Sequence, residues 1–214
     1  MDLVDVWPLF GLRLLSPRLE LTPVRDEDLP VLVEAALAGV HDPAEMPFRV
    51  PWTDRSDEEL SRGLAQHVWQ HRAAIRHGTW SLLLAVVHEG RPIGVQAVTA
   101  ADFAVRRTVE SGSWLTREQQ GRGFGTEMRA AMLSFVFDHL DADVAESGAA
   151  TWNTRSLAVS RKLGYRDNGV ASFVGRPGQR VDEVLLRLER DDFVRPAWQL
   201  RVEGVDAARR ELIG

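Results

Sequence analysis

The pattern of apolar and polar residues along the chain predicts alternating strands and helices. Apolar residues that alternate or cluster between turn residues predict strands, and apolar residues spaced three or four apart predict amphipathic helices. The predicted strands cover approximately 19–24, 80–87, 93–98, 108–115, 144–150, 165–174 and 180–188. The predicted helices cover approximately 29–37, 56–75, 126–140 and 153–163, and a short helix is expected from Val205.

Local signals mark the ends of several of these elements. Ser56 and Glu59 form a capping box that begins the second helix, and Gly164 follows the last residue of the fourth. Residues 41–55 carry three prolines and no period, so they predict a long loop. The order of elements predicts an α/β (α+β) fold, in which one mixed sheet of about seven strands carries helices on both faces.

The length of 214 residues indicates one domain over 1–214. Within it, residues 1–16 are interpreted as an N-terminal arm and 195–214 as a C-terminal tail, both available to a partner subunit. We therefore expect a homo-oligomer.

The composition excludes several classes of protein. With 44% hydrophobic residues and 27% charged residues the chain is not disordered, and a net charge of −5 argues against a nucleic-acid partner. The absence of cysteine removes disulfides, thiolate zinc sites and a cysteine nucleophile. No apolar run is long enough to cross a bilayer and the N-terminus lacks the pattern of a signal peptide, so a cytoplasmic location without membrane contact is expected.

A glycine-rich turn, Gln120-Gly-Arg-Gly-Phe-Gly125, lies between a predicted strand and a predicted helix. The unpaired N–H groups of that helix point toward the turn, where glycines let an anion such as a pyrophosphate approach the backbone. The alternative is a turn that only joins two elements. No Gly-Lys-Ser/Thr follows, so the turn is not a nucleotide P-loop, and its spacing also differs from the dinucleotide-binding fingerprint.

Two blocks of sequence resemble one known family. The stretch Ser113-Trp-Leu-Thr-Arg-Glu-Gln-Gln-Gly-Arg-Gly-Phe-Gly-Thr-Glu127 is similar to the acyl-CoA signature Q/R-x-x-G-x-G/A of the GCN5-related N-acetyltransferases (GNAT), with matches at Gln120, Gly123 and Gly125. The stretch Asn153-Thr-Arg-Ser156 with Arg161-Lys-Leu-Gly-Tyr165 resembles the N-x-x-S…K-L-G-F block of their ribosomal-protein alanine N-acetyltransferase branch. The resemblance implies the GNAT fold and an acyl-CoA-dependent N-acyltransferase.

The resemblance also implies which residues bind the co-substrate. The phosphate cradle would be Gln120, Gly121, Arg122, Gly123, Phe124, Gly125 and Thr126. Leu115 and Thr116 would form the pantetheine edge, and Arg117 and Arg122 would pair with phosphate oxygens. Asn153 matches a pantetheine-contacting asparagine, although a helix N-cap accounts for it equally well. Lys162 lies where the CoA 3′-phosphate is expected, or is a solvated helix lysine.

Direct acyl transfer needs a neutral amine, a stabilised oxyanion and help for the departing thiolate. Many relatives use a tyrosine seven residues after the asparagine, but this chain has Ser160 there, and Tyr165 is interpreted as a packing residue. Ser156 is the predicted donor to the leaving sulfur. The predicted general base is Glu110 on the strand before the glycine turn, with His41 or a water as alternatives.

Several features of the reaction stay open at this level. Acetyl-CoA is the default donor, and succinyl-CoA is the alternative if an arginine such as Arg49 or Arg107 faces the acyl group. The acceptor amine is a protein N-terminus, a lysine or a small molecule. A non-catalytic acyl-CoA-binding regulatory module is the alternative to an enzyme. No metal is expected, because His67 and His71 are interpreted as a solvated helix face.

Overall fold

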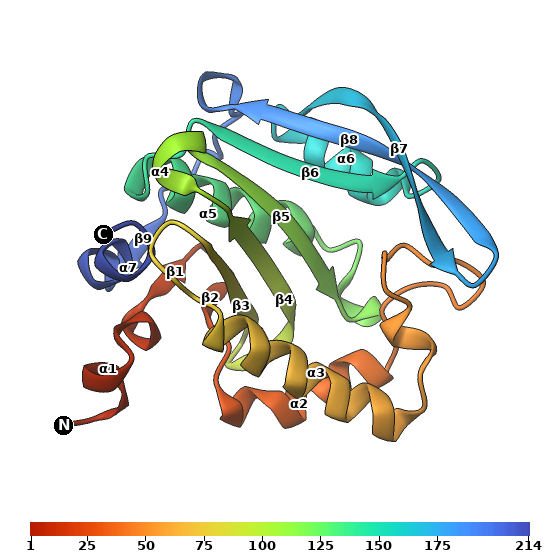
Figure 1. The fold of residues 1–214 in the computed structure, drawn as a ribbon, viewed down its shortest axis with the longest axis horizontal. Helices are drawn as coiled ribbons and strands as arrows, with labels where there is room; N and C mark the ends of the chain where they lie inside the picture. The colour runs from red at the N-terminus through yellow and green to blue at the C-terminus, as the bar shows by residue number, and fades with distance from the viewer.

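The computed structural model describes residues 1–214, which form one twisted sheet with helices packed against it (Figure 1). Its nine strands follow the order β7-β8-β6-β5-β4-β3-β2-β1-β9. All neighbours are antiparallel except β5 and β6, which are parallel. The strands are β1 (Arg13–Leu15), β2 (Glu20–Pro23), β3 (Trp80–His88), β4 (Arg91–Ala100), β5 (Thr108–Leu115), β6 (Val144–Ala150), β7 (Arg166–Arg176), β8 (Gln179–Glu189) and β9 (Arg201–Glu203).

Helices cover both faces of the sheet. They are α1 (Leu3–Val6), α2 (Leu29–Leu37), α3 (Asp57–Ala73), α4 (Phe103–Arg106), α5 (Phe124–His139), α6 (Thr154–Lys162) and α7 (Val205–Leu212). Helices α5 and α6 pack on one face, over a core that includes Phe135 and Ala145. Helices α2 and α3 cover β3 and β4 on the other face, where Leu32 and Leu83 are buried. This second group does not extend over β6 and β8, so that part of the face is left without a helix.

The fold class predicted from the sequence is confirmed, with two more strands than the seven expected. The extra strands β1 and β9 are only three residues long, too short to show a period in sequence. They pair with each other, Leu14 opposite Val202, and β1 also pairs with β2.

Both segments that the sequence analysis interprets as an arm (1–16) and a tail (195–214) thus contribute to the chain's own sheet, and their use by a partner stays a prediction. Leu9, Leu12 and Leu14 in the first segment, and Ala208 and Leu212 in the second, are fully buried in the chain's own core. These apolar side chains cover one end of the same sheet. The homo-oligomer stays a prediction.

Capping residues mark the starts of α3 and α6, as the sequence predicted. The Ser56 hydroxyl accepts a hydrogen bond from the Glu59 amide, and the Glu59 carboxylate accepts one from the Ser56 amide, which completes the capping box of α3. The Asn153 side chain caps α6 by accepting from the Ser156 amide at 3.2 Å. None of the helices combines the length and the apolar composition that crossing a membrane requires.

The parallel strands β5 and β6 separate partway along their length (Figure 1). They pair only from Thr108 opposite Val144 to Ser111 opposite Ser147. Beyond that point β5 remains paired with β4 as far as Leu115, and β6 remains paired with β8 as far as Ala150. We call the gap that opens after Ser111 and Ser147 the fork. The two strand edges that line it have no strand beside them, so their backbone groups are available to a ligand.

Candidate functional site

The turn before α5 presents a run of unpaired backbone N–H groups. The amides of residues 121–126 donate no hydrogen bond within the protein, and the first amide that does is that of Glu127, to the Gly123 carbonyl at 3.1 Å. These six amides, which we call the cradle, stand at the positive end of a 16-residue helix. Unpaired amides at a helix N-terminus are an arrangement that can bind an anion, and the binding of a pyrophosphate by residues 120–126 stays a prediction.

Two glycines are required by the shape of the cradle. Gly121 and Gly123 adopt φ of +75° and +85°, a region that L side chains rarely occupy. A Cβ at Gly123 would also approach the Arg18 guanidinium to 3.3 Å. A Cβ at Gly125 would meet only Val159, at 3.8 Å, so the protein itself does not demand glycine there. Gly125 instead leaves space above the helix terminus for a ligand.

Gln120 and the end of β5 hold the cradle beside the fork. The side-chain nitrogen Nε2 of Gln120 donates to the Val40 carbonyl at 2.6 Å and to the Leu115 carbonyl at 2.8 Å. The Thr116 amide donates to Ile93, so it is committed within the sheet. The Trp114 carbonyl points toward β4. Its oxygen lies next to the position that a Cβ on Gly94 would occupy. By the alternation of a strand, the backbone groups of Ser113 and the N–H group of Leu115 point into the fork without a partner, whereas the Leu115 carbonyl is bonded to Gln120.

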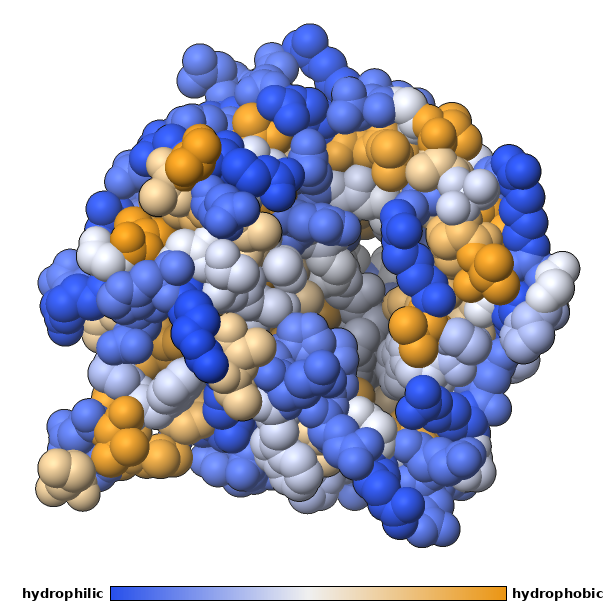
Figure 2. All heavy atoms as spheres, in the orientation of Figure 1, coloured by the Kyte–Doolittle hydropathy of each residue, from blue (hydrophilic) through white to orange (hydrophobic).

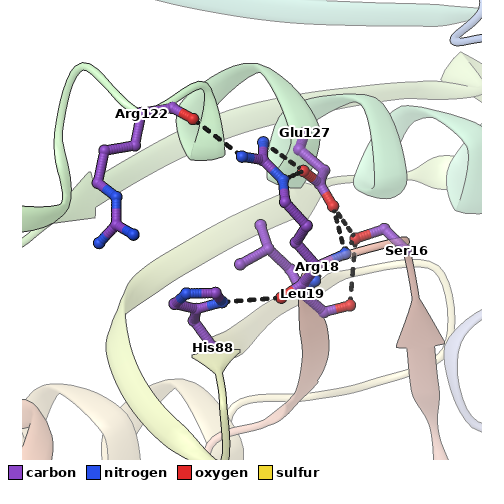
Figure 3. A network of polar contacts seen from close by, with 6 residues as sticks. All are labelled: Ser16, Arg18, Leu19, His88, Arg122 and Glu127. Carbon is purple, nitrogen blue, oxygen red and sulfur yellow. Dashed lines mark hydrogen bonds and ion pairs between the residues drawn. The ribbon is translucent and has the colours of Figure 1, made fainter.

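Figure 3 shows a polar network on the first turn of α5 that the sequence did not reveal. The Glu127 carboxylate, 7% exposed, accepts from the Ser16 hydroxyl, from the Arg18 amide and from Arg18 Nε at 2.7–2.8 Å. Arg18 also donates to the Arg122 carbonyl at 3.0 Å and stacks over the Phe124 ring. The β1–β2 connection is thereby fastened to the cradle, with a guanidinium beside its amides.

A groove of about 360 Å³ runs from the cradle toward the end of α6. Gly123 and Thr126 line it at the cradle, and Arg18, Lys162 and Arg195 supply three cationic side chains. Trp198 lies along the same groove. Lys162 is therefore placed where it can face an anion held near the cradle. Arg117, in contrast, is exposed and makes no side-chain hydrogen bond, while Arg122 donates to the Gln119 side chain and stacks over Phe124.

Glu110 lies at the base of the fork, on the part of the sheet that no helix covers. We call this part the open face. It is the register partner of Glu146 on β6 and of Thr99 on β4, so the three side chains form a row on one face. Glu146 pairs with Arg187 at 3.1 Å, whereas the Glu110 carboxylate has neither a cation nor a hydrogen-bond donor as a partner. Glu110 is thus an exposed carboxylate without a partner in the protein.

Ser156 lies on the first turn of α6, the helix that follows β6, and is partly exposed. Its amide is capped by Asn153, and its hydroxyl makes no hydrogen bond in the protein. A serine in a helix often donates from its hydroxyl to a backbone carbonyl, and Ser156 makes no such bond. Ser160, which occupies the position of the tyrosine in many relatives, is completely buried. Tyr165 packs in the core, 3% exposed.

The loop 41–55 closes one end of the open face, and His41 is bound within it. The two ring nitrogens of His41 contact the Asp42 carbonyl at 2.8 Å and the Thr53 hydroxyl at 2.7 Å. In the neutral ring Nδ1 must donate to the carbonyl, so Nε2 accepts from Thr53 and is not free. An aromatic run then continues from Phe48 through Trp52 to Trp114 on β5, with ring centroids 5.4 Å and 5.7 Å apart.

Ionic contacts fasten this loop to the β7–β8 hairpin. Arg176 donates to the Asp54 carboxylate at 2.6 Å and 3.0 Å and to the Pro43 carbonyl at 2.8 Å. Arg49 pairs with the buried Glu183 on β8. We call these contacts the strap. Figure 1 shows the loop beside the tip of the hairpin, and the space-filling view of the same face is hollowed between this region and the centre of the sheet (Figure 2).

The strap is expected to weaken in acid. Hydrogen bonds from the Arg176 guanidinium hold the pKa of the Asp54 carboxyl below its ordinary value. In the unfolded chain the pKa of an aspartate carboxyl is near 4, and in the folded protein that of Asp54 is lower. The difference stabilises the folded state above about pH 4. This stabilisation is lost as pH falls through the pKa of the folded protein. Because the pair is partly exposed, Asp54→Asn should cost only about 0.5–1 kcal/mol at neutral pH.

The measurement is urea unfolding of wild type and Asp54→Asn between pH 3 and pH 8. The difference in unfolding free energy should be constant above about pH 5 and shrink toward zero below about pH 4. Asp57→Asn, on the first turn of α3 without an arginine partner, is the matched control. A difference between wild type and Asp54→Asn that grows in acid would contradict the assignment.

No group of three or more His, Cys, Asp or Glu side chains is arranged to hold a metal ion. His67 and His71 stack at 4.1 Å between ring centroids, and His71 Nδ1 is bound to the His67 carbonyl. Burial, with a smaller contribution from His71, lowers the pKa of His67. The pair therefore offers two imidazoles on one helix and no third ligand.

Comparisons with known proteins agree with this geometry. A family model described as an acetyltransferase (GNAT) domain matches residues 18–166, more than half of the chain. A curated protein of Bacillus subtilis (strain 168), named "Putative ribosomal N-acetyltransferase YdaF", is 27% identical over 103 residues. That match covers 48% of this chain and 54% of the relative, so the chain spans about half the length of the curated relative it matches.

Solved structures show the same fold. RimJ of Mycobacterium smegmatis, solved in complex with CoA-disulfide, is 20% identical, with a TM-score of 0.68 over 95% of each chain. RimL, named as a ribosomal L7/L12 alpha-N-protein acetyltransferase and solved with coenzyme A, is 18% identical. Its TM-score is 0.66, over 83% of this chain and 97% of that one. The predicted GNAT fold is thus confirmed, and the chain belongs to the acetyltransferase (GNAT) family.

Proposed function

We propose that this protein transfers an acyl group from acyl-CoA to a primary amine, by direct attack within a ternary complex. The observation that carries the proposal is the cradle of six unpaired amides directly beside the fork. A pyrophosphate on the cradle would leave a pantetheine arm free to run along the Ser113 and Leu115 edge, as an added strand does. The thioester would then reach the base of the fork, next to Glu110.

The residues around the fork can serve each proton and charge of the reaction. Glu110 takes a proton from the amine, whose nitrogen forms a bond to the thioester carbonyl carbon. Collapse of the tetrahedral intermediate breaks the carbon–sulfur bond, and the Ser156 hydroxyl donates a hydrogen bond to the departing thiolate. A proton from water completes the free thiol. His41 is a weaker candidate for the base because both of its ring nitrogens are engaged.

Acetyl-CoA is the donor that the site favours. Arg49 is paired with Glu183, and Arg107 lies at the opposite end of β5 with Asp143 as its partner. Neither guanidinium is therefore free for the carboxylate of a succinyl group. The relatives named for ribosomal proteins support a protein N-terminus as the acceptor. The open face between the strap and the Trp52–Trp114 pair is accessible to an extended peptide end.

The test is a thiol-release assay of acetyl-CoA and succinyl-CoA against N-terminal peptides, a lysine peptide and polyamines. Wild type should release CoA fastest with acetyl-CoA and an N-terminal peptide, and Ser156→Ala should lower kcat by about tenfold, for the loss of one hydrogen bond to the leaving group. Ser61→Ala on α3, a helix serine bonded to the Asp57 carbonyl, is the control. If calorimetry shows CoA binding but no amine is acylated, the result would instead support the non-catalytic module. The argument for that module is that buried Ser160 replaces the tyrosine that many relatives use.

A further inference from the structure

One charged side chain of the core has no opposite charge. Arg129 on α5 is 4% exposed, yet no carboxylate lies within ion-pair distance of it. The Arg129 guanidinium donates to three serine hydroxyls instead, those of Ser113 at 3.3 Å, Ser147 at 3.3 Å and Ser160 at 3.2 Å. Its Nε has no partner at all. Every other arginine that is paired in the structure pairs with an acid or a carbonyl at the surface or at the edge of the core.

A buried guanidinium in this state is costly. Taking a charge out of water carries a penalty of several kcal/mol, which neutral hydroxyls only partly offset, and the unpaired Nε adds to it. Such a group is tolerated in a core when it has a use that a methionine or leucine could not supply. The missing element is a negative charge, and no group of the protein provides it.

The position of Arg129 indicates where that negative charge would arise. Its three serine partners come from β5, from β6 and from α6, the elements that surround the fork. Ser147 is the last residue of β6 that pairs with β5, and Ser113 is two residues beyond the last paired residue of β5. The guanidinium thus lies directly beneath the base of the fork, on the face covered by α5 and α6.

Ser113 links the buried charge to the fork. Its hydroxyl oxygen accepts from Arg129 Nη2, and the hydroxyl makes no donor bond to any protein group. Ser147, in contrast, donates to the Ser111 carbonyl at 3.1 Å. A hydroxyl that accepts from a guanidinium is a stronger donor through its own hydrogen, because hydrogen bonds in a chain polarise one another. Ser113 therefore offers a polarised O–H at the edge along which the pantetheine arm would run.

We propose that Arg129 is an electrostatic positioning residue for the acyl transfer, which stabilises the CoA sulfur as a thiolate by acting through the Ser113 hydroxyl. This inference rests on the proposed function. No proton leaves Arg129: the carbon–sulfur bond breaks, the electron pair stays on sulfur, and the fixed positive charge beneath the fork lowers the energy of the resulting anion. Completely buried Ser160, in the place of the tyrosine of many relatives, gives the guanidinium room and a third hydroxyl.

The direct test is the pKa of the thiol of bound CoA, followed by the ultraviolet absorbance of the thiolate as pH is raised. In wild type the bound thiol should titrate about one unit below free CoA, the shift expected for an opposite charge nearby. In Arg129→Met the bound value should return to that of free CoA, and Ser113→Ala should move it in the same direction. Binding of desulfo-CoA, which lacks the sulfur, should change by less than about threefold in both variants, because the cradle is intact.

Turnover and stability supply the controls. Arg129→Met should lower kcat with acetyl-CoA by about thirtyfold, and Arg129→Lys should recover part of the loss by restoring the charge. Arg210→Met, an exposed arginine on α7, removes the same charge far from the fork and should leave kcat unchanged. Without ligand, Arg129→Met should melt at or above the wild-type temperature, since replacing a buried ion by an apolar side chain is often neutral or stabilising.

Three results would overturn the inference. If ligand-free Arg129→Met melts at a lower temperature than wild type and also binds desulfo-CoA more weakly, Arg129 has only a structural role. A loss confined to succinyl-CoA would mean that the guanidinium binds an acyl carboxylate instead. If wild type binds CoA but leaves the thiol pKa at its free value, the electrostatic role is excluded. Absence of CoA binding by wild type would be a failure of the proposed function itself, which keeps the two separable.

Discussion

Gly123→Ala should weaken CoA binding by at least about a hundredfold, which corresponds to the loss of one or two charge-assisted hydrogen bonds. Gly123 is the N-cap of α5 at φ +85°, and its amide is in the middle of the six unpaired amides of the cradle. An alanine there either strains the left-handed backbone or moves it to negative φ, which turns the amides away from a common centre. It also presses a methyl group toward the Arg18 guanidinium that flanks the cradle.

Calorimetric titration of CoA measures this effect, and Gly178→Ala is the matched control. Gly178 lies in the β7–β8 hairpin at φ +75°, where an added Cβ would have no atom within 4 Å, so it carries the same backbone cost without the cradle. Both variants should lose about 1 kcal/mol of stability, and only Gly123→Ala should lose affinity. Equal affinities in the two variants would mean that phosphate is held by side chains rather than by the backbone.

Glu110→Gln should lower kcat/KM by about 10²–10³-fold, the usual range for removing a positioned general base. The glutamine keeps the size of the side chain and removes its ability to take a proton. The loss should be greatest near neutral pH and shrink as pH rises, because a growing fraction of the amine is then already neutral. The measurement is the pH profile of kcat/KM with an N-terminal peptide.

Glu146→Gln is the control for this prediction. Glu146 is the register partner of Glu110 on β6 and lies on the same face, but its carboxylate is held by Arg187. Its replacement should cost less than about tenfold, much less than that of Glu110. Should Glu110→Gln keep the wild-type profile while His41→Ala loses the ascending limb, the base would be His41 despite its bonds within the loop.

The elements and the cradle could be predicted from the sequence, because both depend on neighbours within a few residues. Periodicity placed β5 and β6 at their observed limits, and capping residues placed the starts of α3 and α6. The glycines at 121, 123 and 125 indicated a helix terminus open to an anion, since only glycine allows positive φ and close approach. The signature around Gln120 and the block around Asn153 then indicated the family.

What surrounds the cradle depends on tertiary contacts. Arg18 and Glu127 are 109 residues apart, and Arg176 and Asp54 are 122 apart, so no local pattern connects them. The same holds for β1 and β9, which pair although they lie near opposite ends of the chain. Arg129 lies in α5 together with Glu127 and Asp138, and no local pattern distinguishes it. The environment of its guanidinium depends on three serines that the folding of β5, β6 and α6 brings together beneath the fork. Only the tertiary structure decides this, because burial and charge compensation are properties of the whole packed chain.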